Sequence, residues 1–158
     1  MVIDVRHYEE FPARAVIKAA EGEIAADFDF IVSIKDVTCN LLMHNAGEEY
    51  FCKGEFESDV VMECARCLRQ FRATLTNVAD FTICPAGLHD DDEDAIDDED
   101  YVYLDTNGYT ADVRNIARQS IILAMDISPL CTEDCKGLCL TCKANLNDGP
   151  CKCQQVEQ

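Results

Sequence analysis

The sequence has few of the residues that carry most enzyme chemistry. Its 158 residues include three histidines, His7, His44 and His89, which are scattered along the chain and lack evident partners. A glycine-rich loop of the kind that cradles phosphate groups is also missing from the sequence. Because nothing in the chain resembles a catalytic constellation, we expect a protein that is not an enzyme.

Long apolar runs are missing as well. No stretch approaches the roughly 20 apolar residues that a helix needs to cross a bilayer, so we expect no membrane partner. The first residues, Met1–His7, lack the basic segment and the apolar core of a secretory signal. These absences predict a cytoplasmic protein.

Positive charge is scarce. The chain has 13 Lys and Arg residues against 31 Asp and Glu residues, which gives a net charge of −18. A field of this sign repels nucleic acid at long range and favours basic partners. Direct RNA contact would need a local basic patch, for which the candidates are Arg66, Arg69 and Arg72. We favour the other interpretation, that these arginines bind neighbouring carboxylates or donate hydrogen bonds to metal-bound thiolates.

Cysteine, in contrast, is abundant, and eight of the 11 cysteines fall into four close pairs. In a chain that lacks an export signal, paired cysteines indicate metal binding rather than disulfides. A structural zinc ion takes four ligands in a tetrahedron, so four pairs predict two zinc ions. Iron–sulfur proteins of the common ferredoxin types use other spacings, and zinc is favoured for that reason. The eight candidate ligands are Cys64, Cys67, Cys131, Cys135, Cys139, Cys142, Cys151 and Cys153.

Spacing alone leaves two groupings of these pairs open. The turn formers at 147–150 favour a local site in which the pair at 139 and 142 faces the pair at 151 and 153, as in a compact zinc ribbon. The pair at 64 and 67 would then meet the pair at 131 and 135, more than sixty residues away. In the interleaved alternative, residues 131, 135, 139 and 142 share one metal ion, and residues 64, 67, 151 and 153 share the other.

Apolar and polar residues alternate with a period of two from Ile24 to Ile83, which predicts consecutive β-strands joined by short turns. Two of these strands are expected over 28–34 and 37–43. Such strands form an antiparallel meander, here a curled sheet or partial barrel. The pair at 64 and 67 falls at a hairpin tip between two strands. The unpaired cysteines are most simply small buried hydrophobes, and they are Cys39, Cys52 and Cys84.

A segment with nine carboxylates between residues 90 and 100 interrupts this pattern. We expect residues 88–100 to form a disordered acidic loop, because packing so much like charge together is too costly. A short strand at 101–104 and an amphipathic helix over about 111–125 follow, with Thr110 or Asp112 as the helix cap.

The expected fold class is α+β. One helix covers an antiparallel meander, and a zinc-ribbon-like knuckle follows at the C-terminal end. Residues 1–130 would form a β-rich domain, and residues 131–158 a cysteine-rich, zinc-binding tail that packs on it.

Several of these segments together carry a family resemblance. They are CARCL at 64–68, the acidic segment, the amphipathic helix, CKGLCLTC at 135–142, NLN at 145–147 and the final Cys-x-Cys. In combination, from about Val16 to Cys153, they resemble the YceD family of large ribosomal RNA subunit accumulation proteins. Leu140 and Lys143 stand where Pro and Gly are common in that family.

The resemblance implies a part in the accumulation of large-subunit ribosomal RNA and no established enzymatic activity. We therefore expect a non-catalytic factor that supports large ribosomal subunit assembly. From the negative charge we infer that its partner is a basic ribosomal protein or an assembly intermediate. The alternative hypothesis is a redox-switched zinc chaperone or thiol sensor, in which oxidation would eject zinc and unfold the tail.

Overall fold

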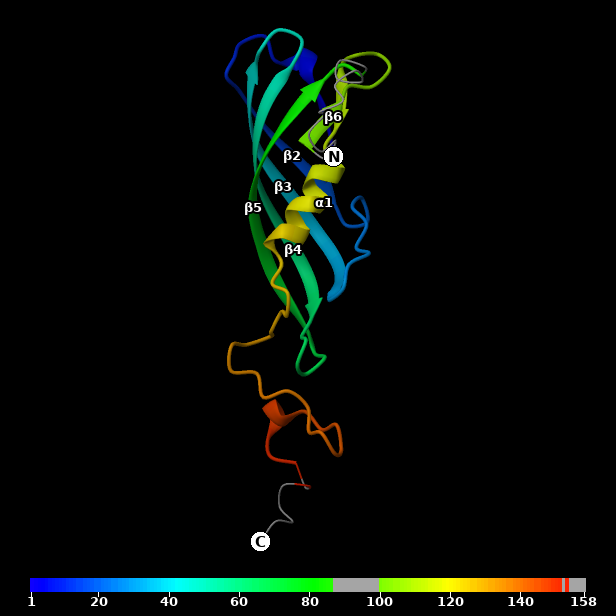
Figure 1. The fold of residues 1–158 in the computed structure, drawn as a ribbon, viewed down its shortest axis with the longest axis vertical. Coiled ribbons are helices and arrows are strands. Elements are labelled where there is room, and N and C mark those ends of the chain that lie inside the picture. The colour runs from blue at the N-terminus through cyan, green and yellow to red at the C-terminus, as the bar shows by residue number, and fades with distance from the viewer. Residues whose placement is uncertain (87–99, 152, 154–158) are drawn as a thin grey trace, which may run out of the picture.

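The computed structural model describes residues 1–86, 100–151 and 153, and it shows an open sheet with one α-helix on one face (Figure 1). The sheet has the strand order β2-β3-β4-β5-β6. Its strands are β2 (Ala13–Ala20), β3 (Ile31–Asn45), β4 (Tyr50–Glu63), β5 (Gln70–Cys84) and β6 (Tyr101–Tyr103). The structure is therefore mostly sheet with one helix, as the expected α+β class requires.

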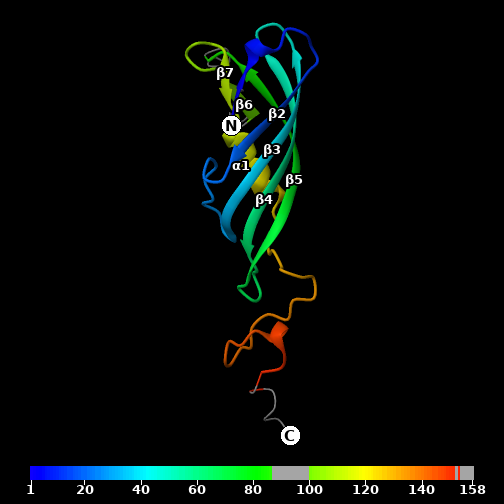
Figure 2. The same ribbon diagram turned by 180° about the vertical axis from the view of Figure 1, so that it is seen from behind.

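The first four strands form the antiparallel meander that the alternating pattern predicts. β6 departs from it, because it pairs with the last three residues of β5 in parallel. The sheet is twisted, and the helix α1 (Arg114–Ala124) lies against one face of it (Figures 1 and 2). None of the described helices is long and apolar enough to span a bilayer.

Strand β3 shows why the expected strand boundaries were wrong in this region. The segments expected at 28–34 and 37–43 belong to one strand that begins at Ile31 and carries two register shifts against β4. Each shift changes which face the next residue occupies. Ile34 and Val37 are therefore both buried, whereas Val32 is 45% exposed.

A second, two-stranded sheet was not foreseen. Its strands are β1 (Val2–Asp4) and β7 (Thr110–Asp112), which pair antiparallel and bury Ile3 and Ala111. The helix consequently begins at Arg114, three residues later than expected, because residues 110–112 are held in the β-ladder. Val113 occupies the cap position in place of Thr110 or Asp112.

The core lies between the helix and the sheet. The helix buries Ile116, Ala117, Ser120 and Ile121 against the strands, which is the role that its apolar stripe predicts. The three unpaired cysteines are buried, as expected, at Cys39, Cys52 and Cys84. Burial raises the pKa of Cys39 and of Cys52 to about 12, so these thiols stay protonated at neutral pH.

The cysteine-rich tail lies at one end of the long axis. The β4–β5 hairpin ends there in a tip at residues 64–69, and the chain after α1 passes this tip and continues beyond it (Figures 1 and 2). The tail includes the short 3₁₀ helix η3 (Leu146–Asp148). Of the acidic segment expected to be a disordered loop, residues 88–99 lie outside the described residues.

Gly54 tests how tightly this core is packed. A Cβ atom at this position would lie 2.7 Å from the ring of buried Phe56 and 3.0 Å from the sulfur of Cys39. We therefore predict that Gly54→Ala lowers the free energy of unfolding by about 1–3 kcal/mol, because neither neighbour can move away without displacing the core. Urea unfolding followed by circular dichroism measures the change. The control is Lys53→Ala on the exposed face of the same strand, and equal effects of the two substitutions would contradict the prediction.

Candidate metal centres

The hairpin tip forms a tight turn around Cys64. The Leu68 N–H donates to the Cys64 carbonyl at 2.9 Å, and Leu68 takes the left-handed conformation with φ of 58°. Burial raises the pKa of the Cys64 thiol, but the backbone N–H groups of Cys131, Cys67 and Arg66 outweigh it and lower the pKa to about 6. The turn and the facing segment after the helix together therefore favour a thiolate, which is the form that binds metal.

The second Cys-x2-Cys segment has the same local structure. The Lys143 N–H donates to the Cys139 carbonyl at 2.9 Å, and Lys143 has φ of 59°. The N–H groups of Cys142 and Thr141 lower the pKa of Cys139 to about 6. Two segments more than seventy residues apart thus form matching turns, each with a thiol that ionises readily.

The first candidate centre joins the tip to the chain that follows the helix. Its four sulfur atoms all lie within 4.8 Å of one another, and its members are Cys64, Cys67, Cys131 and Cys135. The Cys64 and Cys135 sulfurs are 3.7 Å apart, and those of Cys67 and Cys131 are 3.6 Å apart. A disulfide would bring two sulfurs to about 2.05 Å. Four sulfurs at about 2.3 Å from one zinc ion lie about 3.8 Å apart, so the spacing fits a single tetrahedral ion.

Without a metal ion, the four thiols of this group cannot all ionise, because neighbouring thiolates repel one another. Burial, followed by hydrogen bonds that the protonated Cys131 thiol donates to the neighbouring sulfurs, raises the pKa of Cys131 to about 12, opposite to the shift of Cys64. The opposite shifts arise because one thiolate discourages the next from ionising. A cation among the four sulfurs would remove this conflict and favour thiolates at every position.

The second candidate centre lies within the tail. Its sulfur atoms are also within 4.8 Å of one another, and its members are Cys139, Cys142, Cys151 and Cys153. Cys139 and Cys151 are buried, whereas Cys142 and Cys153 are exposed. The sulfurs are thus brought together in the local grouping rather than the interleaved one, and the donor set of each group fits one thiophilic ion.

Comparison with known proteins places the chain in a family. The family model described as "Large ribosomal RNA subunit accumulation protein YceD" matches residues 52–158, which include all eight paired cysteines. The chain belongs to the YceD family. The resemblance seen in the sequence is therefore confirmed.

Two curated relatives of YceD type are similar to part of this chain. Both are named "Large ribosomal RNA subunit accumulation protein YCED homolog 1, chloroplastic". The relative from Arabidopsis thaliana is 35% identical over 63 residues, which are 40% of this chain and 20% of that protein. The relative from Zea mays is 38% identical over 66 residues, which are 41% of this chain and 22% of that protein. The chain thus matches about a fifth of the length of these relatives. No solved structure matches it.

Two of the three candidate arginines in this YceD member contact the protein itself. Arg66 donates to the carbonyl of Cys135 at 3.2 Å, and Arg69 forms an exposed ion pair with Asp148 at 2.6 Å. Both contacts connect the hairpin tip to the tail. Arg72 lies on the exposed sheet surface beside Asp59. These contacts favour the structural interpretation of Arg66 and Arg69 over direct RNA contact.

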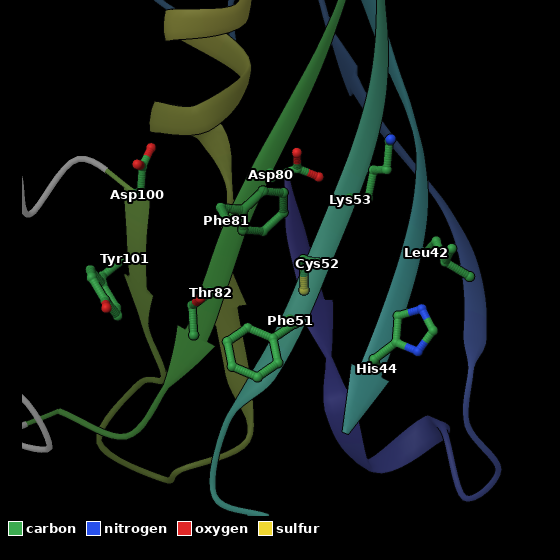
Figure 3. Close-up of a pocket in the computed structure, with 10 residues that line it drawn as sticks. All are labelled: Leu42, His44, Phe51, Cys52, Lys53, Asp80, Phe81, Thr82, Asp100 and Tyr101. Atoms are coloured by element: carbon green, nitrogen blue, oxygen red, sulfur yellow. The ribbon is translucent and has the colours of Figure 1, made fainter. Parts of the chain in front are cut away.

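A broad depression on the sheet face opposite the helix is the other surface feature of note (Figure 3). It has a volume of about 480 Å³ and is lined by solvent-facing side chains such as His44, Phe51 and Asp80. Figure 3 shows His44 on β3 and Asp80 on β5, with β4 between them. A histidine and a carboxylate separated by a strand cannot share a proton, so the depression offers no acid–base pair from these residues.

The two centres should differ in what they hold together. Cys67→Ser weakens the link between the tip and a segment more than sixty residues away, whereas Cys153→Ser affects a loop confined to the tail. Structural zinc binding supplies folding free energy, on the order of 10 kcal/mol in small peptides. We predict that metal content falls from two ions to one in each variant. Cys67→Ser should also lower the melting temperature of the sheet by about 10 °C or more, and Cys153→Ser should leave it nearly unchanged.

Metal analysis and thermal unfolding followed by circular dichroism measure these effects. Cys39→Ala, at a buried cysteine outside both centres, is the control for metal content. Equal loss of the sheet signal in both cysteine variants would contradict this division of roles.

The left-handed backbone conformation of Lys143 is predicted to strain the turn that positions Cys139 and Cys142. A non-glycine residue in the left-handed region costs about 1–2 kcal/mol, and glycine avoids that cost. Lys143→Gly should therefore slow metal release from the second centre several-fold. Lys143→Ala removes the same side chain but keeps the Cβ atom, so it should give no gain. Release into an excess of a chromophoric chelator measures the rates, and identical rates in the two variants would show that backbone strain plays no part.

Proposed function

We propose that this YceD protein is a non-catalytic factor that supports accumulation of large-subunit ribosomal RNA, and that it does so by binding a basic ribosomal protein or an assembly intermediate in the cytoplasm. Family membership carries the first part of the proposal. The printed names of the two relatives agree with it, although the chain spans only about a fifth of their length. The partner is our inference from the charge of the chain.

The two centres support a structural role for metal. Each brings together four cysteine sulfurs, which complete the coordination of a tetrahedral zinc ion. A closed site leaves no position for water or substrate, whereas a catalytic zinc keeps one open. We therefore assign the two zinc ions to holding the tail in shape rather than to chemistry.

The exposed face of the sheet supports a basic partner. Glu55, Glu57 and Asp59 alternate along β4 and are all exposed. Asp36 lies directly opposite Asp59 on the neighbouring strand. Like charges in this arrangement destabilise a sheet, and none of the four forms an ion pair with a residue in the described part of the chain. A cationic partner would relieve this repulsion.

The redox-switched chaperone or thiol sensor remains a second candidate because Cys142 and Cys153 are exposed. Hydrogen peroxide could oxidise the two thiolates to a disulfide, with the peroxide reduced to water and the zinc ion released. Zinc release together with a gain of holdase activity after mild peroxide treatment would favour this candidate. Zinc release without holdase activity would leave the assembly role as the better proposal.

Affinity capture tests the proposed function. We predict that the tagged protein recovers large-subunit ribosomal RNA and basic ribosomal proteins from lysate at low salt. The triple variant Glu55→Gln, Glu57→Gln and Asp59→Asn should recover several-fold less, because it removes three charges without changing the shape of the side chains.

The matched control neutralises three exposed carboxylates elsewhere, at Glu9, Glu10 and Glu48. Equal losses in the two triple variants would show that the partner responds to net charge and not to this face. Failure of the unmodified protein to recover any large-subunit component would count against the proposed function itself.

A further inference from the structure

Asn147 belongs by sequence to the second centre but contacts the first. It lies in η3, within the loop between Cys142 and Cys151 that the second centre closes. Its side-chain oxygen accepts a hydrogen bond from the Lys136 N–H at 2.8 Å, and its side-chain nitrogen donates to the sulfur of Cys135 at 3.3 Å. One amide group therefore holds both the backbone and the sulfur of a segment that supplies a ligand to the first centre.

The orientation of this amide is fixed by its neighbour. Asn145 accepts hydrogen bonds from the backbone N–H and from the side-chain nitrogen of Asn147, both at 2.9 Å. With Asn145 and Lys136 in these roles, the Asn147 nitrogen is directed at Cys135. The Asn-Leu-Asn segment of the sequence thus has a structural explanation: the first asparagine orients the second.

A hydrogen bond to a metal-bound thiolate stabilises its negative charge and fixes its direction. Outer contacts of this kind usually change metal affinity by about 10–100-fold when they are lost. The contact at Cys135 comes from a loop whose own shape depends on the other centre. We propose that Asn147 is a positioning residue that makes metal retention at the first centre depend on an intact second centre.

This inference rests on the proposed structural role of the two metal ions. It has to be separated from simple tethering, because other contacts also hold the loop. Leu146 N–H donates to the Gly137 carbonyl at 2.9 Å, and Leu138 forms a β-bridge with Asn145. Asn147→Asp separates the two effects. It keeps an oxygen that can accept from Lys136, but it removes the donor to Cys135 and places a carboxylate beside the thiolate.

The experiment follows zinc release from zinc-loaded full-length protein into an excess of a chromophoric chelator. We expect two phases, with slow release from the first centre, where three of the four cysteines are buried, and faster release from the second, where two are exposed. The variant Cys67→Ser, which keeps only the second centre, assigns the fast phase. Cys153→Ser keeps only the first centre and should release its one ion faster than the slow phase of the unmodified protein. Asn147→Asp should accelerate the slow phase about tenfold or more while two ions per chain remain bound at saturation.

Asn115→Ala on the exposed side of α1 is the control and should leave both phases unchanged. In the Cys153→Ser background the loop is no longer closed, so Asn147→Asp should add little there. An unchanged slow phase in Asn147→Asp, or the same acceleration in both backgrounds, would overturn the inference. Two bound zinc ions with an unchanged slow phase would refute this inference alone, whereas a protein that binds no zinc would refute the metal role as well.

Discussion

The contact between the β4–β5 tip and the segment after the helix is the one on which the rest of this structure depends. Its buried cluster consists of Cys64, Cys67 and Cys135, with only a few partly buried apolar neighbours such as Phe71 and Leu138. The tail has too little apolar surface to form a core of its own, and segments below about 40 residues usually need metals or disulfides to fold. The sulfurs therefore take the place of a hydrophobic core. A metal ion bound there would be the reason that the tail has a defined structure at all.

Charged side chains are used differently on the sheet and at this contact. The sheet carries alternating carboxylates on its exposed face, and the like-charge pair of Asp36 and Asp59 is tolerated there. The tip and tail instead use Arg66 and Arg69 to bind the carbonyl of Cys135 and the carboxylate of Asp148. These two basic groups are thus engaged within the protein, while much of the acidity of the sheet is left to solvent. This division is consistent with a factor that binds a basic partner on the sheet and uses its tail as a metal-stabilised extension.

Much of this structure could be predicted from the sequence because its strongest signals are local. Alternation along β4 and β5 and the apolar stripe of α1 report directly on which side chains are buried. The cysteine spacing indicated two sites, but the grouping depended on long-range geometry that spacing does not encode.

The alternation of buried and exposed residues expected along β3 was wrong in its first part. Register shifts near Ile31 and Ile34 change which residues face the core, and they leave no clear signal in the sequence. Strand β7 was missed because its pairing with the chain start is non-local, and that pairing delays the helix. Asn147 was singled out as a turn former and as part of a family motif, but its contact with Cys135 was not foreseen because that contact exists only once the tail has folded.

The ligand grouping is the central claim, and one measurement tests it most directly. Cadmium-113 can replace zinc in thiolate sites, and its scalar couplings to cysteine β-protons identify the ligands of each ion in a correlation spectrum. The account predicts two cadmium resonances. One should correlate with Cys64, Cys67, Cys131 and Cys135, and the other with Cys139, Cys142, Cys151 and Cys153. A single resonance, or correlations that mix residues 131–135 with residues 139–142, would contradict it.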